Sequence, residues 1–345
     1  IINIMIKFII FFFHVFVTCA LNSDDCRQKN HPVWLCDYMH LHNKTYKTHS
    51  EMLMRKHKLQ AAKEPEQEDK AYFGLTSRSD RFPHELRSNI AFVADQHKKL
   101  ERMPTFFNTR KYPPIDWRNH NGRNYVTSVK DQGECGGCFA FASAAVLEYW
   151  SARRTGFPKS LSAQSILDCT SGRGRPDIGC DGGLMEYVFE YAKEHPIGLE
   201  QDFPFTGHLN TCPHRLVAHV NVQEYTVVTR EDNKDAEFML EYVLHHYGPV
   251  AAGIDSTRMD NYVGGVYPAS RCSTDIDHAV TIVGYTPNAW IIKNSWGTGW
   301  GEDGYLYLER GKNACGIAEY MVFIRNAYSL IKDEPTFWQM EAYDD

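Results

Sequence analysis

Hydrophobic and polar positions divide the 345-residue chain into three parts. An apolar run, Phe8–Val17, comes first, and a polar, helix-prone segment follows over residues 21–111. That segment holds a single glycine, Gly74, whereas every other glycine, and so every Gly-Gly pair, lies after Tyr112. The pair Pro113-Pro114 therefore predicts a boundary between a small helical segment and a larger body.

The body carries a helical pattern first and strand patterns later. Alanine and aromatic residues from Phe139 to Arg153 favour a helix. Short runs rich in β-branched and aromatic residues predict strands at Tyr225–Thr229, Val280–Val283, Ala289–Ile292 and Tyr305–Leu308. Helices followed by strands favour an α+β architecture of two packed lobes. In the preceding segment Glu51, Arg55 and Leu59 recur every four residues along one helix face, which salt bridging explains without a functional role.

The first apolar run is typical of a secretory signal peptide. Lys7 precedes it and Thr18-Cys19-Ala20 ends it, so we expect a signal peptide in residues 1–20, with Met5–Ala20 as the signal proper. The run is too short to span a hydrocarbon core of about 30 Å. We therefore expect a secretory-pathway protein without a membrane span, in which disulfides are stable.

Charge changes this picture in two ways. Lys and Arg number 37 against 43 Asp and Glu, and a net charge of -6 excludes a general nucleic-acid binder. The sum conceals an asymmetry, because residues 21–111 carry a net +5 and residues 112–345 a net -12, and these opposite signs should attract the first segment to the second. The ten cysteines, for their part, indicate disulfides or a thiol site.

Four residues of the body could form a thiol-based catalytic site. Cys138 stands where glycines give way to a helix, and a helix N-terminus favours the nucleophilic thiolate. His278 enters one apolar strand and Asn294 ends the next, so the asparagine could orient an imidazole that shares a proton with the thiol. Gln132 could donate from its amide to a developing oxyanion, beside the backbone N–H of Cys138.

The motifs around these residues resemble the papain-like cysteine proteases, and cathepsin L in pattern. The resemblance covers residues 112–327 and rests on QGECGGCFAF from Gln132, CDGG from Cys180, DHAV from Asp277 and KNSWGTGWGEDGY from Lys293. Gly137 replaces the family's usual serine and Phe139 its usual tryptophan. The resemblance implies a two-lobed fold, with a helical left lobe, a β-barrel-like right lobe and an active-site cleft between them.

The same resemblance implies site roles. Cys138 is the nucleophile, His278 the general base and then acid, Asn294 its orienter, Gln132 part of the oxyanion hole, and Trp296 a shield for the His278–Asn294 contact. The residues expected around bound substrate are Gly182, Gly183, Leu184, Met185, Gly253, Ile276, Asp277, Ala279, Tyr320 and Trp296. The apolar pocket among them predicts Leu, Val or Phe two residues before the scissile bond, and rejection of Arg because Tyr320 offers no carboxylate. The short Cys169–Cys180 loop favours an endopeptidase.

The resemblance also implies three disulfides, Cys135–Cys180, Cys169–Cys212 and Cys272–Cys315, which leave Cys138 unpaired. The pairing of Cys26 and Cys36 stays open. Residues 21–111 correspond to an inhibitory propeptide, residues 112–327 to the catalytic domain and residues 328–345 to a C-terminal tail. Asn43 begins a glycosylation sequon.

The resemblance implies a monomeric zymogen of the lysosome or the cell exterior that cleaves proteins and peptides. It implies inhibition by the propeptide and by cystatin-type inhibitors, with no cofactor and no metal. Because carboxylates and seven propeptide histidines gain protons in acid, we predict self-cleavage near residues 105–112 below about pH 5.5.

Two alternatives compete with this interpretation. Cys135-Gly136-Gly137-Cys138 has the C-x-x-C spacing of thiol-disulfide oxidoreductases and of half a zinc site. The chain could instead be a catalytically weakened or inactive papain-like binding protein, for which the departures at Gly137 and Phe139 leave room.

Overall fold

The computed structural model describes most of the chain in two compact units, residues 1–63 and residues 64–345. The described residues are 20–63, 66–68, 70–82, 85, 112–171, 177–214, 216, 220–229 and 236–328. The predicted signal peptide up to Cys19, the predicted tail beyond Tyr328 and all but the last residue of the predicted cleavage region lie outside them. Within the described part, no helix is both long and apolar enough to cross a membrane.

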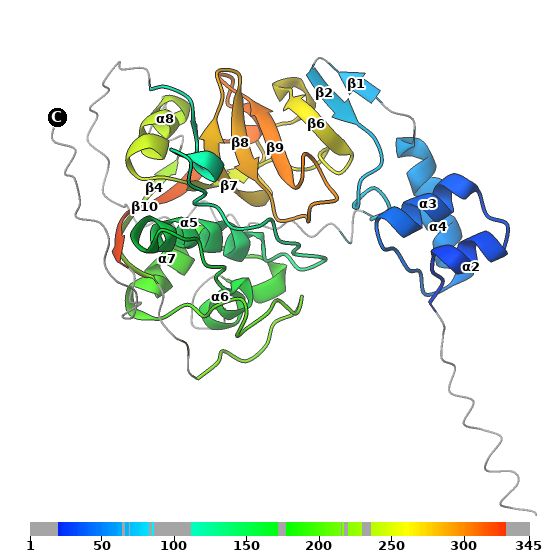
Figure 1. Ribbon diagram of the computed structural model, residues 1–345, viewed down its shortest axis with the longest axis horizontal. Helices are drawn as coiled ribbons and strands as arrows, with labels where there is room; N and C mark the ends of the chain where they lie inside the picture. The colour runs from blue at the N-terminus through cyan, green and yellow to red at the C-terminus, as the bar shows by residue number, and fades with distance from the viewer. Residues whose placement is uncertain are drawn as a thin grey trace, which may run out of the picture. The chain divides into compact units, whose positions relative to one another are not determined.

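The first unit is a small helical body, coloured blue in Figure 1. It contains α2 (Ser23–Gln28), α3 (Val33–Leu41) and α4 (His49–Ala62). The disulfide Cys26–Cys36 joins α2 to α3, which answers the question that the sequence left open. On α4, Glu51 and Arg55 form the expected ion pair at 3.0 Å while Leu59 is buried, so the spacing of four residues is explained by the helix itself.

The second unit is built on one long sheet, and most of its neighbouring strands are antiparallel. The strands in spatial order are β1 (Glu66–Glu68), β2 (Lys70–Phe73), β6 (Tyr262–Tyr267), β9 (Tyr305–Glu309), β8 (Ala289–Lys293), β7 (His278–Tyr285), β5 (Val250–Ile254), β10 (Tyr320–Tyr328) and β4 (Asn221–Thr229). A short β3 (Ile115–Asp116) pairs with β7. The four predicted strands are confirmed within β4, β7, β8 and β9.

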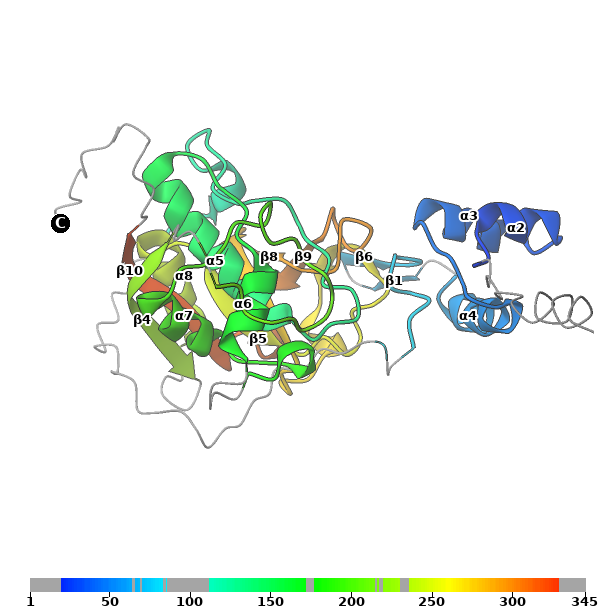
Figure 2. The ribbon, with the colours of Figure 1, turned by 90° about the horizontal axis from the view of Figure 1, so that it is seen from below.

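Helices cover part of this sheet. They are α5 (Cys138–Thr155), α6 (Ala163–Thr170), α7 (Met185–Glu194) and α8 (Ala236–His246), with short 3-10 turns η2 (Trp117–Asn119), η3 (Gly179–Asp181), η4 (Ala269–Arg271) and η5 (Ala314–Gly316). The predicted helix is confirmed as α5, which ends at Gly156 in the left-handed conformation typical of a helix C-terminus. Figures 1 and 2 show α5, α6 and α7 close together.

Two apolar cores confirm the two-lobed α+β prediction. One lies among β5 to β9 and α8, and the other joins α5, α6 and α7 to β4 and β10. Each predicted disulfide is present: Cys135–Cys180 and Cys169–Cys212 in the helical lobe, Cys272–Cys315 in the sheet lobe. Among the described cysteines Cys138 alone is free. Since Cys135 is bridged to Cys180, the C-x-x-C interpretation as a redox dithiol or half a zinc site is wrong.

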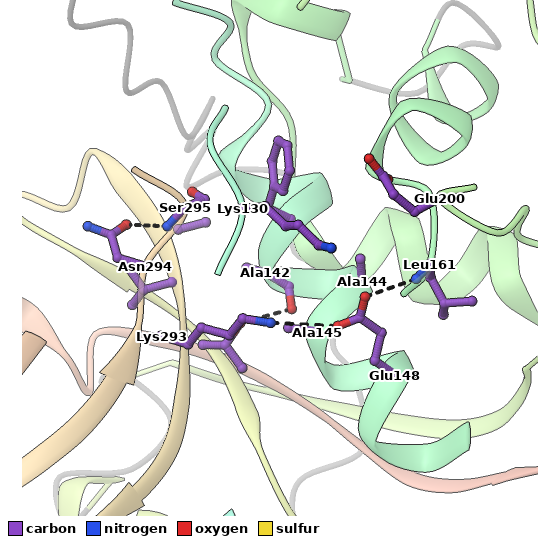
Figure 3. Close-up of a pocket in the computed structure, with 14 residues that line it drawn as sticks. Lys130, Ala142, Ala144, Ala145, Glu148, Leu161, Glu200, Lys293, Asn294 and Ser295 are labelled. Atoms are coloured by element: carbon purple, nitrogen blue, oxygen red, sulfur yellow. Dashed lines mark hydrogen bonds and ion pairs between the residues drawn. The ribbon is translucent and has the colours of Figure 1, made fainter. Parts of the chain in front are cut away.

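A buried ion pair links the helical lobe to the sheet (Figure 3). Lys293 on β8 lies 3.7 Å from Glu148 on α5, beside a small cavity between the two elements. Glu148 also accepts hydrogen bonds from the Thr127 hydroxyl and the Leu161 backbone N–H. Burial lowers the pKa of Lys293, and the charge of Glu148 opposes that shift. The Glu148 carboxylate therefore has several donors as well as its counter-charge, as a buried charge requires.

We expect Glu148→Leu to lower the free energy of unfolding by about 3–5 kcal/mol, because it leaves Lys293 buried without its counter-charge. The double variant Glu148→Leu/Lys293→Met should recover most of that loss, since it removes both charges. Urea unfolding of the two variants measures the difference. A single substitution no more costly than the double one would contradict the assignment.

Candidate active site

The strand pair β7–β8 brings His278 and Asn294 together, as the sequence predicted. His278 is the first residue of β7, and Asn294 directly follows β8, its antiparallel neighbour. The ring Nε2 of His278 lies 2.8 Å from Asn294 Oδ1. With Nε2 as the donor to the amide oxygen, Nδ1 is the ring nitrogen left to accept a proton. Nδ1 has no hydrogen-bond partner among the described residues.

Cys138 lies at the start of α5, beside the start of β7. The backbone N–H of Ala279, the residue after His278, hydrogen-bonds to the thiol sulfur. A second bond, from the Thr281 hydroxyl to the Ala142 carbonyl at 3.1 Å, holds the next turn of α5 against β7. The thiol itself approaches the Gly136 carbonyl at 4.0 Å. The helix N-terminus thus places a thiol next to the strand that carries the imidazole.

Burial disfavours the charged form of both the thiol and the imidazole. Each residue is fully buried. Burial raises the pKa of the Cys138 thiol to about 12, against the opposing effect of the Ala279 N–H. Burial lowers the pKa of His278 to about 3; the Asn294 hydrogen bond opposes this shift, and the positive charge of Arg78 adds to it. A thiolate–imidazolium pair therefore requires that the site be uncovered.

Gln132 is anchored beside the thiol by its neighbours. Its Nε2 donates to the Cys135 carbonyl at 2.9 Å, and its Oε1 accepts from the Ser295 hydroxyl at 2.6 Å. The Ser295 N–H in turn donates to Asn294 Oδ1 at 2.8 Å, so Ser295 connects both amide side chains. A primary amide has two N–H donors, and the second one on Gln132 remains for an oxyanion. Sequence reasoning missed Ser295, although it lies inside the motif that contains Asn294.

Residues 70–82 cover the site. Strand β2 extends the sheet at β6, and beyond it Arg78 stacks on the Trp296 ring at 3.7 Å. The guanidinium Nε lies 3.2 Å from Asp260 Oδ1, and Arg78 is 4% exposed. Trp296 in turn packs against the His278 ring, with centroids 4.8 Å apart. No local pattern predicted this role, because Arg78 stands in a polar stretch without periodicity.

The comparison with known families decides the identity of this site. Residues 113–325 match the family described as papain family cysteine protease. The chain belongs to the papain family of cysteine proteases. The match contains every residue of the cluster around Cys138 except Arg78.

Individual papain-family relatives are similar to this chain over most of its length. The viral cathepsin of Orgyia pseudotsugata multicapsid polyhedrosis virus is 34% identical over 320 residues, covering 86% of this chain and 93% of the viral protein. Cathepsin L of Sarcophaga peregrina is 35% identical over 264 residues, covering 71% of this chain and 76% of that protein.

Solved structures extend the similarity into the region before the body. A digestive procathepsin L 3 from the larval midgut of Tenebrio molitor has a TM-score of 0.71 and 27% identity, and covers 84% of this chain and 97% of that chain. The Carica candamarcensis protease CMS1MS2, in complex with E-64, has a TM-score of 0.53 and 34% identity over 62% of this chain and 98% of its own. This papain-family chain is a cathepsin L-like cysteine endopeptidase in zymogen form.

The two departures from the papain-family pattern are accommodated by packing. Gly137 precedes α5 with φ -79°, and a Cβ there would lie 3.4 Å from both Cys135 Sγ and a methyl group of Leu167, which is ordinary van der Waals contact, so packing does not require glycine at this position. Phe139 is fully buried, and a Cβ on Gly183 would lie 2.7 Å from its ring. Gly182 has φ +125°, which favours glycine. The backbone at Gly182-Gly183 is thus fixed against the helix that carries the nucleophile.

Several of the residues expected around the papain-family substrate pocket belong to one apolar core or touch it. The helical-lobe core contains Leu184, Met185, Ala279 and Tyr320, and Ile276 packs against it. Gly253 on β5 pairs with Ala279 on β7.

Asp277 accepts two hydrogen bonds from Ser256 at one oxygen. Burial raises the pKa of Asp277 to about 6, against those bonds. The hydroxyl of Tyr320 donates to Glu186, a carboxylate that the sequence analysis did not single out.

Proposed function

We propose that this cathepsin L-like zymogen, once uncovered, hydrolyses internal peptide bonds through an acyl-enzyme on Cys138. The observation that carries the assignment is the His278–Asn294 hydrogen bond, held beside a thiol at a helix N-terminus. Asn294 holds the His278 ring so that Nδ1 can take the proton of the Cys138 thiol, and the N-terminus of α5 stabilises the resulting thiolate.

The proposed reaction has two halves. In the first, the Cys138 sulfur bonds to the scissile carbonyl carbon, and the oxyanion accepts from the Cys138 N–H and the Gln132 amide. The imidazolium of His278 gives its proton to the leaving amine as the C–N bond breaks. In the second half, His278 takes a proton from water, which attacks the thioester and releases the acid product. Trp296 keeps solvent away from the His278–Asn294 contact throughout.

An epoxide inhibitor such as E-64, seen with the Carica candamarcensis relative, tests this assignment directly. Attack by the thiolate opens the epoxide and forms one carbon–sulfur bond, so the labelled protein gains one adduct. We expect a single adduct on Cys138, and only after the covering segment is removed. A mature protein that gains no adduct would support an inactive papain-like binding protein.

The pocket residues support a preference for an apolar side chain at P2, the substrate residue two before the scissile bond. Leu184, Met185 and Ala279 offer apolar surface, and Tyr320 closes the group. We expect kcat/KM for Leu, Val or Phe at P2 to exceed that for Arg by at least about tenfold, since a buried cation needs a partner. A library of peptides that vary at P2 measures this, and a preference for Arg would overturn it.

Further proposals concern the precursor as a whole. We infer a monomer of the secretory pathway, in the lysosome or outside the cell, that cystatin-type inhibitors can bind. Asn43 is exposed at the end of α3, as a glycosylated asparagine must be. We propose that residues 21–111 form the inhibitory propeptide, that maturation cuts near residues 105–112, and that residues 112–327 remain as the catalytic domain. The structure divides its compact units after Lys63 instead, because β1 and β2 join the sheet of the body.

A further inference from the structure

A buried carboxylate lies directly behind Tyr320. Glu186 is the second residue of α7, and it is 6% exposed. Its Oε2 accepts a hydrogen bond from the hydroxyl of Tyr320, the fully buried first residue of β10. The two residues are 134 positions apart in sequence. Their contact therefore depends on the packing of α7 against the sheet strands β4 and β10 (Figure 1).

This bond determines which surface Tyr320 presents. A buried carboxylate is costly without donors, and hydrogen bonds to a charged acceptor are stronger than neutral ones. The hydroxyl of Tyr320 is thus committed to Glu186, and its ring joins the apolar cluster of Leu184, Met185 and Ala279. Burial raises the pKa of the Tyr187 and Tyr225 phenols, and the charge of Glu186 adds to that shift in both.

We propose that Glu186 determines the P2 selectivity of this enzyme by fixing Tyr320 as an apolar floor that covers the carboxylate. The inference rests on the proposed function, which assigns Tyr320 to the P2 pocket. A branched apolar side chain at P2 meets the ring and the surrounding aliphatic groups. An arginine side chain meets the same ring and cannot reach the carboxylate behind it, so its guanidinium stays without a partner.

The proposal makes Glu186 a latent site for a cation. With the ring removed, the carboxylate faces the pocket directly, and a guanidinium can form a bidentate pair with it. Glu186 is a positioning residue in the wild-type enzyme, because it acts on the substrate through Tyr320. A purely structural residue would change stability without changing the order of preferred P2 side chains.

The test compares P2 profiles of the matured enzyme, with each preparation normalised by epoxide titration of Cys138. We expect Tyr320→Ala to raise the ratio of kcat/KM for Arg over Leu at P2 at least about tenfold, mainly through KM. The double variant Tyr320→Ala/Glu186→Gln should lose that gain, since a neutral amide cannot compensate the guanidinium charge. An equal gain in both variants would overturn the role of Glu186.

Substitutions of Glu186 alone give a second readout with little change in pocket volume. Glu186→Leu removes the carboxylate that accepts from the Tyr320 hydroxyl, so polar P2 residues such as Gln should gain at least about fivefold relative to Leu in kcat/KM. Glu186→Gln keeps an acceptor for the Tyr320 hydroxyl, so its order of preferred P2 residues should match that of wild type. A Glu186→Leu profile identical to wild type would also overturn the inference, even if Tyr320→Ala does not mature.

Failure of this inference is distinguishable from failure of the proposed function. If no Tyr320 or Glu186 variant changes the P2 profile of an active enzyme, Tyr320 lies outside the pocket and the pocket assignment falls together with the inference. If Tyr320→Ala admits larger apolar residues but not Arg, the pocket assignment stands and the role of Glu186 is wrong. If the wild-type enzyme neither titrates with the epoxide nor cleaves any peptide, the proposed function itself is wrong.

Discussion

Replacement of Cys138 by serine is expected to lower kcat/KM for peptide hydrolysis by about 10⁴-fold or more, as removal of a nucleophile does in other acyl-transfer enzymes. A serine hydroxyl does not ionise at the pH at which a thiol does, and His278 and Asn294 are arranged to work with a thiolate. His278→Ala should lose activity on a similar scale. Both variants must be matured by added protease, because neither can process itself.

A buried serine on the same helix provides the matched control. Ser143 lies on α5, and its hydroxyl has no hydrogen-bond partner among the described residues, so Ser143→Ala should keep nearly full activity. Assays of all three variants with one peptide separate loss of chemistry from damage to α5. Activity of Cys138→Ser within tenfold of wild type would contradict the assignment of the nucleophile.

Residues in local motifs could be placed from the sequence because their positions follow from the ends of regular elements. Cys138 begins a helix, His278 begins β7 and Asn294 follows the neighbouring strand β8. The register of these two strands was enough to bring His278 and Asn294 together. The three body disulfides followed from the family resemblance and are present.

Residues that act through distant tertiary contacts could not be placed. Arg78 reaches Asp260 across 182 positions, and Glu186 reaches Tyr320 across 134. Arg78 stands in locally polar sequence, the usual pattern of a solvated surface, and Glu186 is a single charge among apolar and aromatic neighbours. Their burial depends on how segments pack, and no spacing along the chain reports it.

Charge summed over segments was also an incomplete guide to contacts. It predicted a basic propeptide on an acidic body, and Arg78 with Asp260 fits that sign. Arg271, however, pairs with Glu66 and Glu68 at 3.2 and 2.6 Å. In these pairs the base belongs to the body and the acids belong to the predicted propeptide, the reverse of what net charge predicts. Individual ion pairs depend on local geometry, so net charge predicted an attraction without predicting which residues make it.

The zymogen variant Arg78→Ala is expected to mature about 30-fold faster than wild type at pH 7. Arg78 contributes a desolvated cation–π contact with Trp296 and an ion pair with Asp260, together about 2 kcal/mol or more toward the covered state. Loss of both raises the population of the uncovered state by a corresponding factor. Arg78→Lys should mature at a rate between those of Arg78→Ala and wild type, because an ammonium keeps the charge but cannot stack as a planar guanidinium does. Arg27→Ala, which breaks an exposed pair with Asp37, is the matched control and should mature like wild type.

Acid should act on the same covered state through His278. Its pKa is about 3 in the covered site, lowered by burial and by Arg78, and an uncovered imidazole returns toward the ordinary value near 6.5. The uncovered state therefore binds the proton more tightly, so the covered state is favoured above about pH 6.5 and loses stability as pH falls toward 3. Maturation of the wild-type zymogen should accelerate over that range, by at most about tenfold per pH unit for one proton. Equal rates at pH 7.5 and pH 4.5 would contradict this linkage. In Arg78→Ala the covered imidazole already lacks the nearby positive charge, so its pKa lies closer to the uncovered value and the dependence on pH should be weaker.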